Sequence, residues 1–203
     1  MIIINNPSGN SGSVSSLPNG VLINGVCYIN QTTKPTTRPD SSALVVGDRW
    51  LSPSTNIDAF WNGTYWLSPT QQITTIKASG GSGGAAGVKG NSTSNSILPI
   101  GQPIFIDKVT YSYFISGSTV DTSNFYTLRG GYAGAASGAI VIPEITIDIK
   151  TTGAISGSLA TNLYQANAAG SNAALDFTVQ VLFTGSPTGG SSLGFSYYFR
   201  QVY

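Results

Sequence analysis

The sequence has no histidine, one cysteine and few charged residues. Histidine is the side chain that most often serves as acid, base or metal ligand near neutral pH. Because Cys27 stands alone, neither an intrachain disulfide nor a cysteine metal cluster can form, and its apolar neighbours predict a small core residue. No run approaches the ~18 apolar residues of a membrane helix. We therefore predict no metal, no cofactor and no membrane insertion.

Charged residues make up 8% of the chain, where about 25% is usual. The nine Lys and Arg residues are scattered and offset by eight carboxylates, so no basic stripe for phosphates exists and no nucleic-acid partner is expected. So few charges give a monomer little electrostatic repulsion. Either hydroxyls and amides solvate the surface, as in a plain Ser/Thr/Asn-rich domain, or other subunits bury it, which indicates a homo-oligomer.

Composition and turn signals divide the chain into four segments. Residues 1–32, with two short β-prone runs, are interpreted as an arm that gains order on a partner, or else as a frayed terminus. Residues 33–69, here called the Trp-rich module, hold all three tryptophans. Residues 70–95 contain a Gly/Ser-rich run and are predicted to be a linker. Residues 96–203 are predicted to be a β-sandwich domain.

The strongest local signal in the Trp-rich module is the pair Asn62-Gly63 between aromatic residues. Such a pair is typical of a two-residue hairpin turn, which needs positive φ at both positions. The register that follows pairs Trp61 with Thr64, Phe60 with Tyr65, and Ala59 with Trp66. Trp61 and Trp66 then share one side. Because the module is too short for a large core, its clustered aromatics must supply most of its stability.

Period-two alternation dominates residues 96–203. Apolar and polar residues alternate around Ile104–Ile115, Ile145–Ile149 and Phe177–Phe183, with Gly, Ser and Thr between the runs. This pattern predicts a series of antiparallel strands, and the number of runs suits a β-sandwich or jelly roll. A short helix is predicted only around Leu159–Ala169. The expected fold class is all-β.

Two glycine-rich motif matches fail on their chemistry. Gly80–Gly84 fits the Gly-x-Ser-x-Gly elbow of hydrolases, but that elbow needs a histidine base. A phosphate-binding loop needs Gly-Lys followed by Ser or Thr, whereas Gly90 follows Lys89. Both matches are by-products of low complexity.

Paired carboxylates are the remaining enzyme chemistry, because a glycan-cleaving protein can use two of them about 5–10 Å apart. The candidates are Asp40, Asp48, Asp58, Asp107, Asp121, Glu144, Asp148 and Asp176. Glu144 and Asp148 would point to the same face of a strand, but polar residues on any exposed face have the same spacing. Asp40 and Asp48 lie beside Arg38 and Arg49 and are more simply turn-capping or ion-paired groups.

Several tyrosines could stack on sugars, although such residues more often line an interface or the rim of a core. They are Tyr111, Tyr113, Tyr132, Tyr197, Tyr198 and Tyr203. No binding site is assigned to them.

The Trp-rich module resembles a small unit that recurs in phage tail fibres and related virion proteins. That family has Pro-Thr-Thr-Arg-x-Asp-Gly-Ser-x-Leu-x-x-Gly-Asp-x-Trp, then an aromatic Asn-Gly hairpin ending in Trp. The matching residues are Pro35, Thr36, Thr37, Arg38, Asp40, Ser42, Leu44, Gly47, Asp48, Trp50, Trp61, Asn62, Gly63 and Trp66. The departures are Ser41, where the family has glycine, and Leu51-Ser-Pro after the first Trp.

The resemblance implies a virion setting, a spacer or attachment role, threefold association and no catalytic residues. We therefore expect a non-catalytic structural protein of a bacteriophage. The Gly-Asp-x-Trp and Asn-Gly-Thr-Tyr-Trp stretches resemble those of phages of cyanobacteria. The protein's partners would be other virion proteins and a host surface glycan or protein. Residues 1–6 lack the features of a signal peptide, as expected for a subunit made in the cytoplasm. The alternatives are a capsid decoration or cement protein and, in a different class, a polysaccharide-active enzyme.

Overall fold

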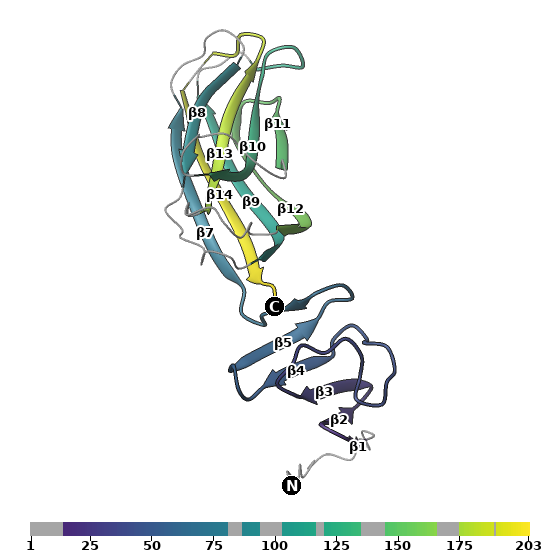
Figure 1. Cartoon of the computed structure of the whole chain (residues 1–203). Helices are drawn as coiled ribbons and strands as arrows, with labels where there is room; N and C mark the ends of the chain where they lie inside the picture. The colour runs from purple at the N-terminus through teal and green to yellow at the C-terminus, as the bar shows by residue number, and fades with distance from the viewer. Residues whose placement is uncertain are drawn as a thin grey trace. The chain divides into compact units, whose positions relative to one another are not determined.

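The computed structural model describes residues 14–80, 87–93, 103–116, 120–134, 145–165, 175–188 and 190–203. The chain divides between Pro69 and Thr70 into two compact units, and Tyr203 belongs with the first. Unit 1 is Met1–Pro69 with Tyr203, and unit 2 is Thr70–Val202. Figure 1 shows that strands make up both units.

Unit 1 is built on one six-stranded sheet whose spatial order follows the chain order. Its strands are β1 (Val14–Leu17), β2 (Gly20–Ile23), β3 (Val26–Asn30), β4 (Arg49–Ser52), β5 (Ile57–Trp61) and β6 (Trp66–Leu67). All neighbouring pairs are antiparallel except β3 and β4, which are parallel. A parallel pair needs a long crossover, and residues 31–48, which carry the family-like motif, provide it.

One face of this sheet carries the core of unit 1. Alternation along β3 buries Cys27 and Ile29, while Tyr28 points to the other face. Trp50, Ala59 and Trp66 complete the buried cluster. The predicted burial of Cys27 is confirmed, since its exposed fraction is 0%.

The prediction of a partner-dependent arm over residues 1–32 is wrong for the part that the structure describes. Val14–Asn30 forms the hairpins β1–β2 and β2–β3, which extend the sheet of this chain. The turns explain this, because Asn19 and Asn24 take positive φ of 56° and 51°, a region that Asn tolerates. Residues 1–13 lie outside the described residues.

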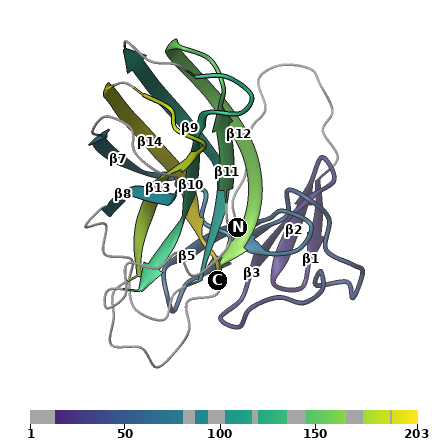
Figure 2. The same cartoon turned by 90° about the horizontal axis from the view of Figure 1, so that it is seen from above.

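Unit 2 contains two four-stranded antiparallel sheets. Its strands are β7 (Gln72–Gly80), β8 (Gly87–Thr93), β9 (Ile104–Ser116), β10 (Phe125–Gly134), β11 (Ile145–Ile149), β12 (Gly153–Gln165), β13 (Leu175–Thr184) and β14 (Gly190–Gln201). One sheet has the order β12-β9-β14-β7 and the other β11-β10-β13-β8. Figure 2 shows these strands from above.

The strand order is that of a jelly roll. Strands β7 and β8 each form the edge of a different sheet. The chain then changes sheet at every step except from β10 to β11, and its last two strands, β13 and β14, lie beside β8 and β7. Two Greek keys folded over one another give this arrangement. The predicted all-β class and the antiparallel β-sandwich of jelly-roll type are confirmed.

The core of unit 2 lies between the two sheets. Along β14, Leu193, Phe195, Tyr197 and Phe199 are all buried, because alternate side chains of a strand point to the same face. Residues of β7, β9, β10, β11 and β13 complete the cluster. At Gly130, an added Cβ would lie 2.6 Å from the Tyr197 hydroxyl oxygen, so the absence of a side chain makes room for that ring.

The predicted linker over residues 70–95 is wrong where it is described, because β7 and β8 are strands of unit 2. In β7 the alternation of Thr74 and Ile76 toward the core follows period two, and the strand pairs with β14 along its whole length. Strand β8 contains two glycines and pairs with the apolar strand β13. Pairing with a long neighbour thus stabilises strands whose own composition is typical of a flexible segment.

The helix predicted around Leu159–Ala169 is also wrong, since β12 runs to Gln165 and residues 166–169 are outside the described part. Leu159 and Leu163 have helical spacing, but an irregularity between Ala160 and Leu163 shifts the pairing of β12 with β9. The Thr161 hydroxyl donates to the Ile106 carbonyl at 2.7 Å within this bulge. A bulge adds residues to one strand, so the side chains beyond it change faces. Apolar residues on either side of the bulge can then have the spacing expected of a helix. In the described ranges, no helix has the length and hydropathy of a membrane span.

Candidate functional site

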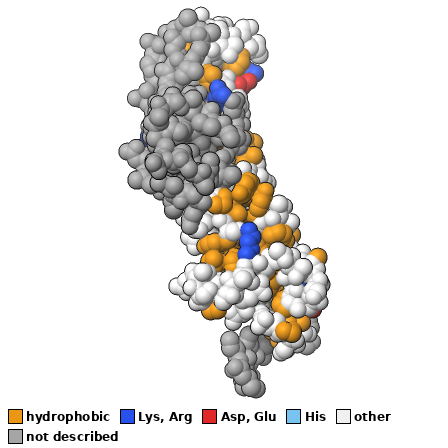
Figure 3. Space-filling model, in the orientation of Figure 1, with side chains coloured by type: hydrophobic (Ala, Val, Ile, Leu, Met, Phe, Trp, Pro, Cys, Tyr) orange, Lys and Arg blue, Asp and Glu red, His pale blue; other side chains and the backbone are white. Residues whose placement is uncertain are grey.

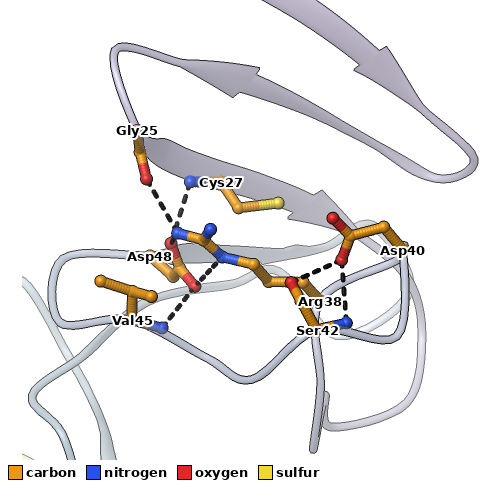
Figure 4. A network of polar contacts seen from close by, with 7 residues as sticks. All are labelled: Gly25, Cys27, Arg38, Asp40, Ser42, Val45 and Asp48. Carbon is orange, nitrogen blue, oxygen red and sulfur yellow. Dashed lines mark hydrogen bonds and ion pairs between the residues drawn. The ribbon is translucent and has the colours of Figure 1, made fainter.

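Unit 1 contains a buried polar site, the ion pair of Arg38 and Asp48, drawn in Figure 4. Arg38 Nε donates to Asp48 Oδ2 at 2.9 Å, and Arg38 Nη2 donates to Asp48 Oδ1 at 2.7 Å. Two backbone amides also donate to this carboxylate, Cys27 N to Oδ1 and Val45 N to Oδ2, each at 2.9 Å. Arg38 Nη2 reaches the Gly25 carbonyl as well, at 2.8 Å. The pair therefore ties the crossover to the β2–β3 turn and to β3.

The pair is buried and stays ionised. Asp48 is fully buried, and the side chain of Arg38 is 13% exposed. Burial raises the pKa of the Asp48 carboxyl, but hydrogen bonds from Arg38, Val45 and Cys27 outweigh it and hold the pKa below its ordinary value. The bonds to Asp48 likewise raise the pKa of Arg38. Burial, and after it the Asp48 carboxylate, raises the pKa of the Cys27 thiol, so this thiol is not activated as a nucleophile.

Asp40 shapes the turn of the crossover instead of binding Arg38. Its Oδ1 accepts from Ser42 N at 3.0 Å and from the Ser42 hydroxyl at 2.6 Å. These bonds lower the pKa of the exposed Asp40 carboxyl. Ser41 between them has a φ of 68°, in the region that glycine adopts most easily. A glycine at this position would adopt the same φ without a Cβ clash.

Tryptophans form the core beside the ion pair. Trp66 is fully buried, with ring centroids of Trp50 at 6.0 Å and of Trp61 at 5.5 Å. Each of two indole N–H groups donates to a crossover carbonyl at 2.9 Å: Trp50 to Gln31 and Trp66 to Pro35. The crossover is thus bonded to the sheet through its indoles as well as through Asp48.

Tyr203 completes this cluster, which local sequence reasoning missed. Its ring meets Trp50 edge-on at 6.4 Å, its N–H donates to the Trp66 carbonyl at 3.0 Å, and the Lys34 ammonium donates to its carbonyl oxygen. Tyr203 lies far from the three tryptophans in the sequence, so no local pattern predicts this role. Tyr203 is therefore a structural residue of unit 1.

The hairpin at Asn62 has a longer loop than the predicted two-residue turn. Trp61 pairs with Trp66 and Phe60 with Leu67, so the loop is residues 62–65 and the predicted register is wrong. Asn62 Oδ1 accepts from Thr64 N at 2.9 Å and from Tyr65 N at 2.7 Å. This side-chain turn replaces the backbone turn. Gly63 has the expected positive φ, 103°, and Trp61 and Trp66 still share one side.

The motif residues thus have identifiable tasks in the fold. Gly47 takes a φ of 97°, and its amide donates to the Trp61 carbonyl at 2.9 Å. Together with the contacts above, this accounts for Arg38, Asp40, Gly47, Asp48, Trp50, Trp61, Asn62, Gly63 and Trp66. Each holds a turn, a strand junction or the aromatic core of unit 1.

Each described candidate carboxylate forms an ion pair or accepts hydrogen bonds within a turn. Asp58 pairs with Arg49 at 2.6 Å, Asp107 with Arg200 at 3.0 Å, and Asp148 with Lys150 at 2.9 Å. The Asp121 carboxylate accepts from the amides of Ser123 and Asn124 in a turn, which lowers its pKa. The bond from Lys150 lowers the pKa of Asp148. Glu144 and the side chain of Asp176 lie outside the described residues.

The tyrosines considered for sugar stacking point mostly inward. Tyr113 and Tyr197 are 2% and 0% exposed, and Tyr111 packs against the core of unit 2. Tyr198 lies on the outer face with the Lys108 ammonium 4.4 Å from its ring centroid. The side chain of Tyr132 is not described. Buried rings cannot stack on a ligand, so Tyr113 and Tyr197 belong to no binding platform.

Unit 1 also has a polar hollow of about 340 Å³. Its lining residues are Pro18, Asn19, Gln31, Thr33, Lys34, Thr36, Thr37, Arg38, Pro39 and Ser41. The hollow lies within the size range of small-molecule sites, but those are mostly apolar and aromatic. Among the residues that the structure describes, no three His, Cys, Asp or Glu side chains form a group able to hold a metal ion.

Neither a family model nor a curated protein matches this chain. Among solved structures it is similar to a chain of the infectious bursal disease virus Gx strain structure, with 11% identity and a TM-score of 0.33 over 98% of this chain. This chain spans 52% of that one. It is also similar to a chain of the semi-empty VLP of giant freshwater prawn Macrobrachium rosenbergii nodavirus: 9% identity, a TM-score of 0.27, and 84% and 95% of the two chains. Likenesses at these TM-scores carry no argument about function.

Proposed function

We propose that this chain is a non-catalytic structural protein of a bacteriophage particle, a fibre-like or surface-projecting subunit. The observation that carries the proposal is the combination, in one chain, of a jelly-roll unit with a Trp-rich module whose motif residues resemble those of phage fibre proteins. In that module the Arg38–Asp48 pair and the tryptophans serve the fold. A residue pattern that specifies a small stable unit suits a spacer or attachment piece, which needs no reaction centre.

The jelly roll supports a structural setting at the level of fold alone. Eight-stranded jelly rolls are common in viral shells and also in lectins and cupins, so the fold does not decide among these functions. The low charge of the chain adds a second argument, since a chain with only 8% charged residues has a surface well suited to burial against other subunits. On the face that Figure 3 shows, charged side chains are sparse.

In this proposal the chain works as a homo-oligomer, with a trimer implied by the resemblance to fibres, and contacts other virion proteins. Unit 2 would be the part that meets a host surface glycan or protein. The second candidate function is a capsid decoration or cement protein, which the jelly-roll strand order of unit 2 favours. A polysaccharide-active enzyme is disfavoured because the described candidate carboxylates are occupied in ion pairs and turns.

Cryo-electron microscopy of particles from the source of this gene tests the proposal. Density for the chain at a tail, baseplate or projecting fibre is the expected result. Density spread over the icosahedral shell would replace the fibre role with the cement role. If mass spectrometry of purified particles does not detect the chain, the proposal of a virion protein is overturned.

A further inference from the structure

The sheet of unit 1 has a second face that belongs to no core cluster among the described residues. The side chains on this outer face follow from the strand register and from the burial of Cys27, Ile29, Trp50 and Ala59 on the opposite face. They are Val14, Val21, Ile23, Val26, Tyr28, Leu51 and Phe60, together with Ser16, Asn30, Arg49 and Asp58; Leu67, which pairs with Phe60 on the same side, is buried. We call this set the outer face of unit 1.

The outer face is unusually apolar for a surface. Val14, Tyr28 and Leu51 are 62%, 37% and 41% exposed, while Val21, Ile23, Val26 and Phe60 are half-buried. Val45 and Val46, 49% and 67% exposed, belong to the adjoining loop. Single exposed apolar residues are ordinary, but a contiguous group of them marks an interaction surface.

Charge on the outer face is limited to one residue of each sign at its centre. Arg49 lies in a cross-strand row between Tyr28 and Phe60, and Asp58 is the direct neighbour of Leu51 on β5. Arg49 Nη2 and Asp58 Oδ1 are 2.6 Å apart. Their side chains are still 32% and 47% exposed, so each can accept a second partner from outside.

This pattern is self-complementary. A second copy that stacks face to face across a two-fold axis in the plane of the interface, perpendicular to the line from Arg49 to Asp58, would set its Arg49 against Asp58 and its Asp58 against Arg49, with apolar residues around both pairs. In an isologous contact each residue of a pair meets its counterpart on the other copy, so the surface must carry both charges of the pair. A different partner protein would need only one charge opposite in sign to one of them. We propose that the outer face of unit 1 binds the outer face of a second copy of this chain.

The inference deepens the proposed function by naming the partner of one surface, and it rests on that proposal only for its role in a particle. The test uses the purified full chain, so failure of self-association and absence from the virion are separate results. Desolvation of the apolar residues would provide the attraction, and the reciprocal charge pairs would fix the orientation of the two copies.

Charge exchange between two variants tests the pairing. In R49E the introduced glutamate lies beside Asp58, and in D58K the introduced lysine lies beside Arg49, so a copy of either variant repels another of the same kind. When the two are mixed, each introduced charge faces its opposite. We expect the self-association constant of each variant, from sedimentation equilibrium, to fall roughly tenfold. An equimolar mixture should recover dimers that contain both variants.

A loss of folding cannot produce this recovery on mixing, because a misfolded variant has no intact face to offer. A matched pair of substitutions adds a control: L51D places a charge on the outer face, whereas L159D does so at a similar exposure of 42% in unit 2. L51D should abolish dimers and L159D should retain them. The inference is overturned if the unmodified chain is monomeric at all concentrations, or if R49E, D58K and their mixture associate like the unmodified chain.

Discussion

The guanidinium of Arg38 binds both oxygens of the Asp48 carboxylate, with N–O distances of 2.9 Å and 2.7 Å. The two residues are ten positions apart: Arg38 lies within the crossover of residues 31–48, and Asp48 is its last residue before β4. Because Asp48 also accepts from the amides of Cys27 and Val45, this single carboxylate fixes the crossover that allows β3 and β4 to run parallel. The stability of unit 1 therefore depends on a charged pair inside an otherwise aromatic core.

Arg38→Lys tests that dependence. Lysine keeps the charge but cannot span both carboxylate oxygens and the Gly25 carbonyl at once. We expect a loss of about 1–3 kcal/mol in the free energy of unfolding of unit 1, because at least one buried acceptor loses its hydrogen bond while the charge is kept. Urea unfolding followed by tryptophan fluorescence reports on unit 1 alone, since all three tryptophans lie there.

The matched control is Arg49→Lys, in the more exposed pair with Asp58. A surface pair of that kind contributes about 0–1 kcal/mol, so this variant should unfold near the urea midpoint of the unmodified chain. Equal losses for the two lysine variants would contradict a special role for Arg38.

The depressed pKa of Asp48 predicts acid sensitivity of unit 1. Because the folded pKa lies below the ordinary value of 3.8, the ionised form stabilises the folded state above that value. This contribution is lost as the pH falls from 3.8 through the folded pKa. The free energy of unfolding of unit 1, measured by urea titration between about pH 7 and about pH 3, should therefore fall at the acidic end.

Asp48→Asn removes the titrating group and should flatten this pH dependence while lowering stability at neutral pH. Asp40→Asn is the comparison, because the pKa of Asp40 is also lowered but its carboxyl is exposed and binds only its own turn. If D40N flattens the profile as much as D48N does, the acid sensitivity does not come from the buried pair.

Sequence patterns predicted most of unit 2, because alternation survives wherever a strand has one buried and one exposed face. The runs in β9, β11 and β13 are such cases. The pattern failed at β7 and β8, where glycine and serine conceal strands that a long neighbour stabilises. It failed again at β12, where the bulge before Leu163 breaks the period of two. In each case the deciding interaction is made by a residue distant in the sequence.

In unit 1 the motif showed which residues matter but not what they contact. The pair Asn62-Gly63 correctly predicted the position of a hairpin. The predicted loop was too short, because the Asn62 side chain accepts the hydrogen bonds that a backbone turn would make. Asp48 was expected to be a turn-capping or ion-paired group, and it is ion-paired. That its partner is Arg38 and not its neighbour Arg49 follows only from the fold of the crossover.

Ser41→Gly should stabilise unit 1. Ser41 holds a φ of 68°, which costs a residue with a Cβ about 1–2 kcal/mol relative to glycine. Glycine loses more backbone entropy on folding, so the expected net gain in the free energy of unfolding is about 0.5–1 kcal/mol. The reverse change at Gly47, Gly47→Ala, introduces the same strain at a φ of 97° and should destabilise. A gain from G47A, or a loss from S41G, would show that φ does not decide these positions.

Gly130→Ala should destabilise unit 2. The added Cβ would meet the Tyr197 hydroxyl oxygen at 2.6 Å and Phe195 Cζ at 2.9 Å, and both rings are fully buried in the opposite sheet. Neither ring can move outward without displacing its neighbours, so we expect a loss of about 1–3 kcal/mol, as is usual for an overpacked core. Tryptophan fluorescence does not report on unit 2, and thermal unfolding by calorimetry and far-ultraviolet circular dichroism is the appropriate measurement.

Ser156→Ala provides the control on an exposed position of β12. It changes no core volume and should leave the unfolding transition within about 0.5 kcal/mol of the unmodified chain. Gly130→Val should destabilise unit 2 more than Gly130→Ala, because two further methyl groups must fit between Gly130 and the two rings. If the three variants unfold alike, the packing of Tyr197 and Phe195 over Gly130 does not limit the stability of the jelly roll.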